Sequence, residues 1–297
     1  RLRRWKKRRT RRRKRLAQSR MTRLILLGVV CAMSLGVAAC VPAEDNHSEA
    51  GSAPYTTVVP STPRAESPGS SPVPPGTALD VSSREPVPGE NFDFYLCTVA
   101  WSFVLDDART IAVTASHCGK PGDKVWAGTQ EGDFAYPADP VGEVIYSDFF
   151  AEETNHLDVA FIELYRDAQY FTPGEVATTV ATQLDKLPDA VCKLGSSTIV
   201  TCGNVKNAVD STQLNYQGLE HDSNAALAEM CSAVGDSGGP VYGDVDGRQT
   251  IVGLVSGITE PLDEGHSCED TQQNIDVAFT TAPDIQELAL KVLGPVA

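Results

Sequence analysis

The chain has 297 residues, enough for one domain of about 200 residues with appendages. It holds 39 acidic and 25 basic residues, but 14 of the basic ones lie in residues 1–23, which contain no acidic residue. The remainder therefore carries a formal charge of −28. So acidic a body is repelled by nucleic acid and other anionic polymers, which argues against a nucleic-acid partner.

The first forty residues have the pattern of an export signal. Met21-Thr22-Arg23 is a short positive region, and an apolar run follows from Leu24 to Ala39. The length of this run suits the core of a signal peptide better than a membrane-spanning helix, so we expect a signal peptide over residues 21–39. Because the basic head precedes an export signal, a nucleic-acid arm there is disfavoured. Residues 1–20 are expected to be either a mis-assigned start or a cytoplasmic extension.

The signal ends in Val37-Ala38-Ala39-Cys40, which resembles the signal of bacterial lipoproteins. The resemblance implies that Cys40 is lipidated and becomes the new N-terminus, so that the protein is held at the outer face of the cell membrane. The alternative is an ordinary cleaved signal followed by a chance cysteine, which implies a secreted protein.

Residues 40–90 are predicted to form a disordered tether. Residues 41–90 contain ten prolines, with many Ser, Thr, Gly and Ala and almost no large apolar side chains. Such a stretch does not bury enough surface to offset the entropy of ordering it. A folded propeptide is the rival interpretation, and this composition argues against it.

From about residue 91 short apolar runs alternate with turn residues, a pattern typical of an all-β barrel or sandwich. Strands are expected at residues 96–105, 109–115, 141–146, 157–164, 205–209, 249–256 and 275–280. The tail differs, because Ile285, Leu288, Ala289 and Val292 recur at helical spacing. We expect a C-terminal helix over residues 282–293, with Thr281 as its cap and Gly294-Pro295 after its end.

Three segments carry the residue types of an acyl-transfer site. They are Thr114-Ala115-Ser116-His117-Cys118, the apolar run that Asp158 opens, and Gly235-Asp236-Ser237-Gly238-Gly239-Pro240. Catalysis at an amide needs a nucleophile, a base that takes its proton and a carboxylate that orients the base. The histidine and aspartate segments alone are more often ordinary strands or turns, whereas the six matching positions around Ser237 already argue against a plain glycine turn. Together they predict a catalytic Ser237, His117 and Asp158.

These segments and their order along the chain resemble the trypsin/chymotrypsin-like serine proteases. The resemblance implies a protease domain over residues 91–297: two six-stranded antiparallel β-barrels, at about 91–185 and 186–280, and the C-terminal helix. The first barrel would supply His117 and Asp158 and the second Ser237, with the site in the cleft between them. It implies a monomer that acts on proteins or peptides without a cofactor.

Six of the eight cysteines lie after the signal, where an exported domain keeps disulfides. Six cysteines allow fifteen pairings, and spacing alone does not choose among them. The resemblance implies the pairs Cys97–Cys118, Cys192–Cys202 and Cys231–Cys268, the second of which is typical of the bacterial streptogrisin and α-lytic protease branch. No Cys-x-x-Cys or Cys/His spacing indicates a metal site.

The same resemblance assigns supporting roles near the nucleophile. The backbone N–H groups of Gly235 and Ser237 would form the oxyanion hole. Asp236, a carboxylate in a poorly solvated turn, needs a partner, and the bacterial branch implies Lys193. An exposed surface lysine is the alternative.

Ser256 resembles the serine that hydrogen-bonds the catalytic aspartate, and Ser256, Gly257 and Ile258 would bind the substrate backbone and side chain. Ile258 and Val277 would leave room for small aliphatic side chains. Glu229 would instead favour Arg or Lys. The sequence leans weakly to the first preference.

The function predicted from these residues is extracellular hydrolysis of peptide bonds through a Ser-His-Asp triad and an acyl-enzyme. Two alternatives remain open. One is a catalytically silent homologue that serves as a surface binding module, and the other is an esterase with the same triad. The physiological substrate is not legible in the sequence.

Overall fold

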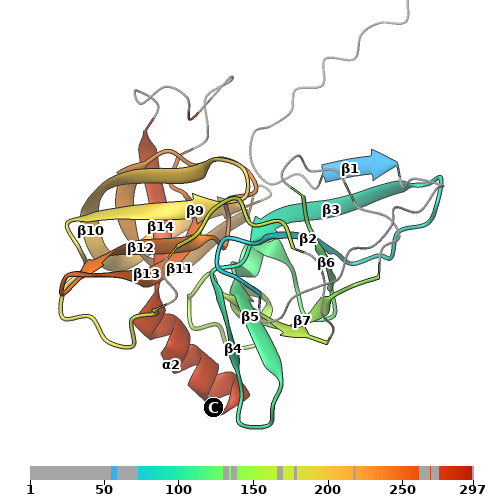
Figure 1. Ribbon diagram of the computed structural model, residues 1–297, viewed down its shortest axis with the longest axis horizontal. Helices are drawn as coiled ribbons and strands as arrows, with labels where there is room; N and C mark the ends of the chain where they lie inside the picture. Colours follow the sequence, from blue (N-terminus) through green and yellow to red (C-terminus); the bar gives the residue numbers. More distant parts are fainter. Residues whose placement is uncertain are drawn as a thin grey trace, which may run out of the picture. The chain divides into compact units, whose positions relative to one another are not determined.

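The computed structural model describes residues 55–58, 73–129, 134, 139–165, 170–176, 179–216, 219–260, 268 and 274–295. They form two antiparallel β-sheets followed by one helix, so the predicted all-β fold is confirmed (Figure 1). Within these ranges no helix is long and apolar enough to cross a membrane. The basic extension, the signal peptide and Cys40 lie outside the described residues.

The first sheet has eight strands in the order β1-β3-β2-β6-β7-β8-β5-β4. Their bounds are Tyr55–Val58 (β1), Ala78–Ser82 (β2), Asn91–Thr98 (β3), Trp101–Val104 (β4), Thr110–Thr114 (β5), Lys124–Ala127 (β6), Gly142–Ser147 (β7) and Ala160–Leu164 (β8). Buried and partly exposed residues alternate along most of β3 and at the start of β7, which is the period of a strand with one face on a core, whereas β2 is buried at every residue.

The second sheet is a closed six-stranded barrel in the order β10-β11-β14-β13-β12-β9. Its strands are Ala190–Gly195 (β9), Ile199–Tyr216 (β10), Leu219–Met230 (β11), Pro240–Val245 (β12), Arg248–Ile258 (β13) and Ile275–Thr281 (β14). The barrel interior is filled by small and β-branched side chains around Met230 and Phe279.

The C-terminal helix α2 runs from Ala282 to Leu293 with Thr281 as its N-cap, as predicted. It buries Ile285, Leu288 and Ala289, which share one hydrophobic cluster with Phe161 of the first sheet and Leu254 of the second. The helix therefore packs against a core to which both sheets contribute.

The prediction of a tether over residues 40–90 is wrong for the parts that the structure describes. Strand β2 lies inside it, fully buried between β3 and β6, and β1 pairs with the edge of β3. The high proline content of the segment led to the prediction of disorder. A strand of four or five residues such as Tyr55–Val58 still forms where its own residues favour a strand and a neighbouring strand offers an edge to pair with.

Two further predictions need correction. The first sheet has eight strands rather than six, and two of them, β1 and β2, lie in the segment expected to be a tether. The single strand expected over residues 96–105 is two strands, β3 and β4, separated at Val99 and Ala100. Three-residue 3₁₀ helices follow β5 and β7, at Ser116–Cys118 and Asp148–Phe150.

One buried residue of the first sheet has no electrostatic partner. Asp80 on β2 is fully buried, and neither of its carboxyl oxygens has a hydrogen-bond partner. Its neighbours across the strands are Leu96 and Trp126. Burial raises the pKa of Asp80 well above its usual value, because an ionised carboxylate there would lack solvation.

This predicts a pH-dependent effect of Asp80→Asn. Since the folded-state pKa exceeds the unfolded one, the wild type loses stability as the pH rises from the unfolded pKa toward the folded pKa. The Asn variant does not lose stability in this way. The difference in free energy of unfolding between the variant and the wild type should therefore grow by about 1.4 kcal/mol for each unit by which the folded-state pKa of Asp80 exceeds the unfolded one. Urea unfolding of both proteins at about pH 4 and about pH 8 measures this. An equal difference at both pH values would contradict it.

Candidate active site

His117 and Asp158 form a close pair at one end of the first sheet. His117 lies in the short helix after β5, and Asp158 precedes β8. The imidazole Nδ1 is 2.8 Å from Asp158 Oδ2, and the backbone N–H of His117 donates to Oδ1 at 3.0 Å. Asp158 is fully buried, whereas the His117 side chain keeps 13% of its surface exposed. With Nδ1 facing the carboxylate, Nε2 is the nitrogen left to face a reacting group.

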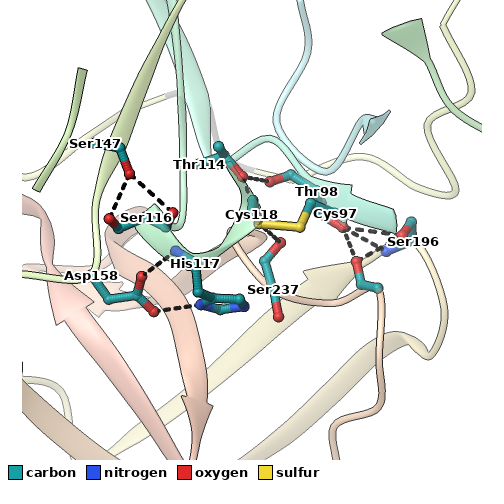
Figure 2. The surroundings of a disulfide bond; sticks show 11 residues. Cys97, Thr98, Thr114, Ser116, His117, Cys118, Ser147, Asp158, Ser196 and Ser237 are labelled. Carbon is teal, nitrogen blue, oxygen red and sulfur yellow. Dashed lines mark hydrogen bonds and ion pairs between the residues drawn. A yellow bond between two sulfur atoms is a disulfide. The ribbon is translucent and has the colours of Figure 1, made fainter. Parts of the chain in front are cut away.

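Ser237 comes from the second sheet and lies beside the His117 ring, on the side away from Asp158 (Figure 2). Its carbonyl accepts the backbone N–H of Thr98 at 2.8 Å, and the N–H of Gly238 donates to Val255 at 2.7 Å. The loop that carries the serine is therefore hydrogen-bonded to both sheets.

Glycine is required on each side of this serine. Gly238 has φ +82°, and a Cβ there would lie 2.1 Å from Thr114 Oγ1. Gly235 has φ +99°, and a Cβ would lie 2.2 Å from Ser197 Oγ and 2.9 Å from a Leu96 methyl. Larger residues would have to displace these neighbours and adopt an unfavourable backbone conformation.

The carbonyl of Gly235 is held by two hydroxyl groups that sequence analysis missed. Thr98 Oγ1 donates to it at 2.7 Å and Ser196 Oγ at 2.9 Å. Fixing this carbonyl fixes the following peptide plane, and with it the turn whose Gly235 and Ser237 N–H groups were predicted to bind an oxyanion. No local signal in the sequence marks Thr98 or Ser196, because Thr98 lies 137 residues and Ser196 lies 39 residues from Gly235 along the chain.

Asp236 and Lys193 form a fully buried ion pair. Lys193 Nζ donates to Asp236 Oδ2 at 2.8 Å, and both side chains have no exposed surface. Burial is the main influence on Lys193 and lowers its pKa, and the nearby carboxylate opposes that shift. The partner that the resemblance implied for Asp236 is present, and the alternative of an exposed surface lysine is excluded.

Further donors complete the surroundings of the Asp236 carboxylate. The backbone N–H groups of Ser197, Thr198 and Ala233 donate to it at 3.0–3.1 Å, and the Thr198 hydroxyl donates at 2.5 Å. The Ser232 hydroxyl adds a longer contact of 3.3 Å. These donors lie in the turn between β9 and β10 and in the loop before Ser237. The Gly-Ser-Ser-Thr turn that begins two residues after Lys193 is a signal that could have indicated them.

A second buried carboxylate organises the loop before Asp158. Asp148 accepts the Tyr146 hydroxyl at 2.7 Å, the Thr154 hydroxyl at 2.8 Å, the side-chain amide of Asn155 at 2.6 Å and the N–H of Leu157 at 3.0 Å. Burial alone would raise the pKa of Asp148, but these hydrogen bonds outweigh it and lower the pKa.

The same loop is tied to the residue before His117. Ser116 Oγ accepts the N–H of Phe149 at 2.9 Å and lies 2.7 Å from the hydroxyl of Ser147 (Figure 2). The two halves of the His117–Asp158 pair are therefore held by one network, although sequence analysis singled out neither Asp148 nor Ser147.

Ser256 does not have the contact that we expected. Its hydroxyl pairs with the hydroxyl of Thr280 at 2.8 Å rather than with Asp158. The pairing of β13 with β14 shifts register between Val255 and Gly257, so Ser256 is the extra residue of a bulge. That local geometry is invisible in the sequence.

The structure brings together two of the residues expected to set specificity. Ile258 pairs with Val277 across β13 and β14, and Val277 is fully buried, with Gly257 next to Ile258 on the same strand. Glu229 lies on β11 opposite Asp276, and its side chain is exposed.

The described part of the chain contains three disulfides, and they join the pairs that the resemblance implied. These are Cys97–Cys118, Cys192–Cys202 and Cys231–Cys268. The first joins β3 to the helix that carries His117, directly beside Ser237 (Figure 2). Among the described residues no group of three or more His, Cys, Asp or Glu side chains is placed to hold a metal ion.

The chain belongs to the trypsin family, because the family model named Trypsin matches residues 102–277. No curated protein matches the sequence. Among solved structures, Protease A of Thermobifida fusca is similar at 20% identity, over 75% of this chain and 97% of that one, with a TM-score of 0.50. That match shows a shared chymotrypsin-like fold.

Two other bacterial proteases give lower structural scores. A chymotrypsin of Cellulomonas bogoriensis is 19% identical, over 73% of this chain and 94% of that one, with a TM-score of 0.47. A protease of Nocardiopsis is 16% identical, over 71% and 94%, with a TM-score of 0.46.

The buried ion pair generates a prediction. Lys193→Met should leave the Asp236 carboxylate unpaired, at a cost of about 3–5 kcal/mol in stability, and relax the turn at Gly235. Loss of one aligned oxyanion donor lowers kcat roughly 10²–10³-fold, so kcat should fall far more than KM rises. Thermal unfolding and steady-state kinetics on a peptide amide measure both effects.

The control is Lys186→Met, which removes an exposed lysine paired with Asp189 and should change neither quantity. The double variant Lys193→Met/Asp236→Asn should regain part of the lost stability, because no uncompensated charge remains. Wild-type kcat in Lys193→Met would contradict the role given to the pair.

Proposed function

We propose that this member of the trypsin family is an exported serine endopeptidase in which Ser237, His117 and Asp158 act as the catalytic triad. The observation that carries the proposal is the hydrogen-bonded His117–Asp158 pair with Ser237 beside the imidazole. The strained glycine turn and the fully buried support of Asp236 add to it.

The proposed reaction follows from these positions. His117 Nε2 takes the proton of Ser237 Oγ as the oxygen attacks the substrate carbonyl, and Asp158 stabilises the imidazolium through Nδ1. The N–H groups of Gly235 and Ser237 bind the oxyanion. His117 then gives the proton to the departing amine, which leaves an acyl-enzyme on Ser237. A water molecule, activated in the same way, releases the acid.

A small aliphatic residue before the scissile bond is the preference we favour. The buried Val277 and its neighbour Ile258 are bulky and apolar, and they leave no charged group for a basic side chain. Glu229, the residue that would have favoured Arg or Lys, is exposed on the surface of β11.

We further propose that the protein is a monomer held at the outer membrane face through lipid on Cys40, after removal of residues 21–39. Three disulfides support export, because such bonds persist outside the cytoplasm. A soluble secreted form is the alternative. Residues 1–20 would then be a mis-assigned start or a cytoplasmic extension.

The silent homologue and the esterase remain as alternative functions. A silent homologue has usually lost a member of the triad, and here His117, Asp158 and Ser237 are all present. An esterase would use the same residues, and family membership favours peptide substrates over simple esters.

Labelling of Ser237 tests the catalytic proposal. A fluorophosphonate probe should form an adduct that mass spectrometry maps to Ser237, and Ser237→Ala should abolish it. The same substitution should lower amide hydrolysis by several orders of magnitude without unfolding the domain. Ser197→Ala, which alters a neighbouring hydroxyl outside the triad, is the matched control for labelling. No labelling of the folded wild type would favour the silent homologue.

Anchoring is tested at Cys40. The expressed full chain should partition into detergent and carry diacylglycerol on Cys40, because stable retention needs two or more acyl chains. Cys40→Ser should release the protein into the aqueous phase, whereas Cys31→Ser within the signal should not. If Cys40→Ser associates with the membrane as the wild type does, the lipoprotein hypothesis is wrong, and the segment is an ordinary signal peptide.

A further inference from the structure

Strand β1 occupies the same edge of β3 that reaches the nucleophile. It pairs antiparallel with the first half of β3, where Tyr55 faces Phe94 and Thr57 faces Phe92. At the other end of β3 the N–H of Thr98 donates to the carbonyl of Ser237. Figure 1 shows β1 lying along β3, outside the rest of the first sheet.

The alternation of backbone groups along a strand shows that β1 and Ser237 contact the same edge of β3. Backbone N–H and C=O groups of a strand point to alternate edges, so those of residues 92, 94, 96 and 98 share a direction. The opposite edge of β3 is taken by β2, to which Val99 is linked by its N–H donating to Thr77. The backbone of Leu96 therefore faces the β1 side, between the end of β1 and Ser237.

The chain direction of β1 matches that of a departing product. Strand β3 runs toward Ser237, so a strand antiparallel to it runs away from Ser237 from its N-terminus to its C-terminus. A peptide substrate has the same polarity beyond its scissile bond. Tyr55 pairs with Phe94, which lies four positions before Thr98 on β3. The end of β1 and the residue that contacts Ser237 are therefore about 13 Å apart along the strand.

Side-chain contacts hold β1 in this place. The Tyr55 ring stacks on Phe94 with centroids 6.0 Å apart, and Thr56 Oγ1 donates to Asp93 Oδ1 at 2.6 Å. Partial burial of Tyr55, and then the negative charge of Asp236, raise the pKa of its phenol.

We propose that strand β1 is the chain's own occupant of the outer part of the β3 edge along which the leaving half of an extended peptide substrate pairs. The inference rests on the proposed function, since it takes Ser237 as the point of cleavage. Main-chain pairing on a sheet edge is a common mode of peptide recognition. Strand β1 thus competes with substrates that extend several residues past the scissile bond, and it leaves short substrates unaffected.

The test variant is Thr57→Pro, which removes an N–H that faces β3 from the ladder. Val58→Pro is the matched control, because the N–H of that residue points away from β3. A short substrate with a chromogenic amide at the scissile bond and a peptide extended by about six residues beyond it are compared. We expect Thr57→Pro to raise kcat/KM for the extended peptide on the order of tenfold and to leave the short substrate unchanged.

A binding measurement separates this inference from the proposed function. In the Ser237→Ala background, a fluorescein-labelled peptide of residues 51–62 should bind Thr57→Pro but neither the parent nor Val58→Pro, as read by fluorescence anisotropy. Equal binding to all three proteins, or no binding to any, overturns the inference whether or not the chain is a protease. Absence of all hydrolysis together with selective binding would overturn the protease proposal and support the peptide-binding edge.

Discussion

The nucleophile loop depends on one buried carboxylate, that of Asp236. An uncompensated charge in such a place would cost several kcal/mol, and this one is met by the Lys193 ammonium, the Thr198 hydroxyl and three backbone N–H groups. Lys193 is not a flexible arm reaching in from the surface. It belongs to β9, which pairs with both β10 and β12. The geometry of the turn before Ser237 is therefore set by the closed barrel itself, through a residue inside the domain.

A second constraint joins the two sheets, and it centres on the end of β3. Thr98 donates its N–H to Ser237, donates its hydroxyl to Gly235 and accepts the hydroxyl of Thr114 on its carbonyl. The preceding residue is bridged to the His117 helix by a disulfide. The proposed base, His117, and the proposed nucleophile, Ser237, come from different sheets, yet both are anchored to the same few residues. Their separation thus depends little on how the outer strands of either sheet move.

The sequence predicted those features that local chemistry determines. The three segments of the proposed triad are recognisable because their residue types occur together and in one order along the chain, and the helix over residues 282–293 shows its period and its cap directly. The predictions that failed concern features that depend on pairing between distant residues. Strand β2 is selected by burial between β3 and β6, despite proline-rich surroundings, and a bulge turns Ser256 toward Thr280. Thr98, Ser196 and Asp148 act through contacts for which no local pattern exists.

Two buried carboxyl groups of the first half of the domain give it opposite responses to pH. Asp148 has a lowered pKa, so the stability it contributes is present above its unfolded pKa and is lost as the pH falls through the folded pKa. Asp80 has a raised pKa, so the folded protein loses stability as the pH rises from the unfolded pKa of this group toward its folded pKa. The two groups also differ in location. Asp148 holds the loop that leads into Asp158, and Phe149 of that loop donates its N–H to Ser116 beside His117. Asp80 instead lies on β2, where it pairs with Leu96 of β3. A fall in pH therefore weakens the loop that leads into Asp158, whereas a rise in pH above the unfolded pKa of Asp80 weakens the region where β2 pairs with β3.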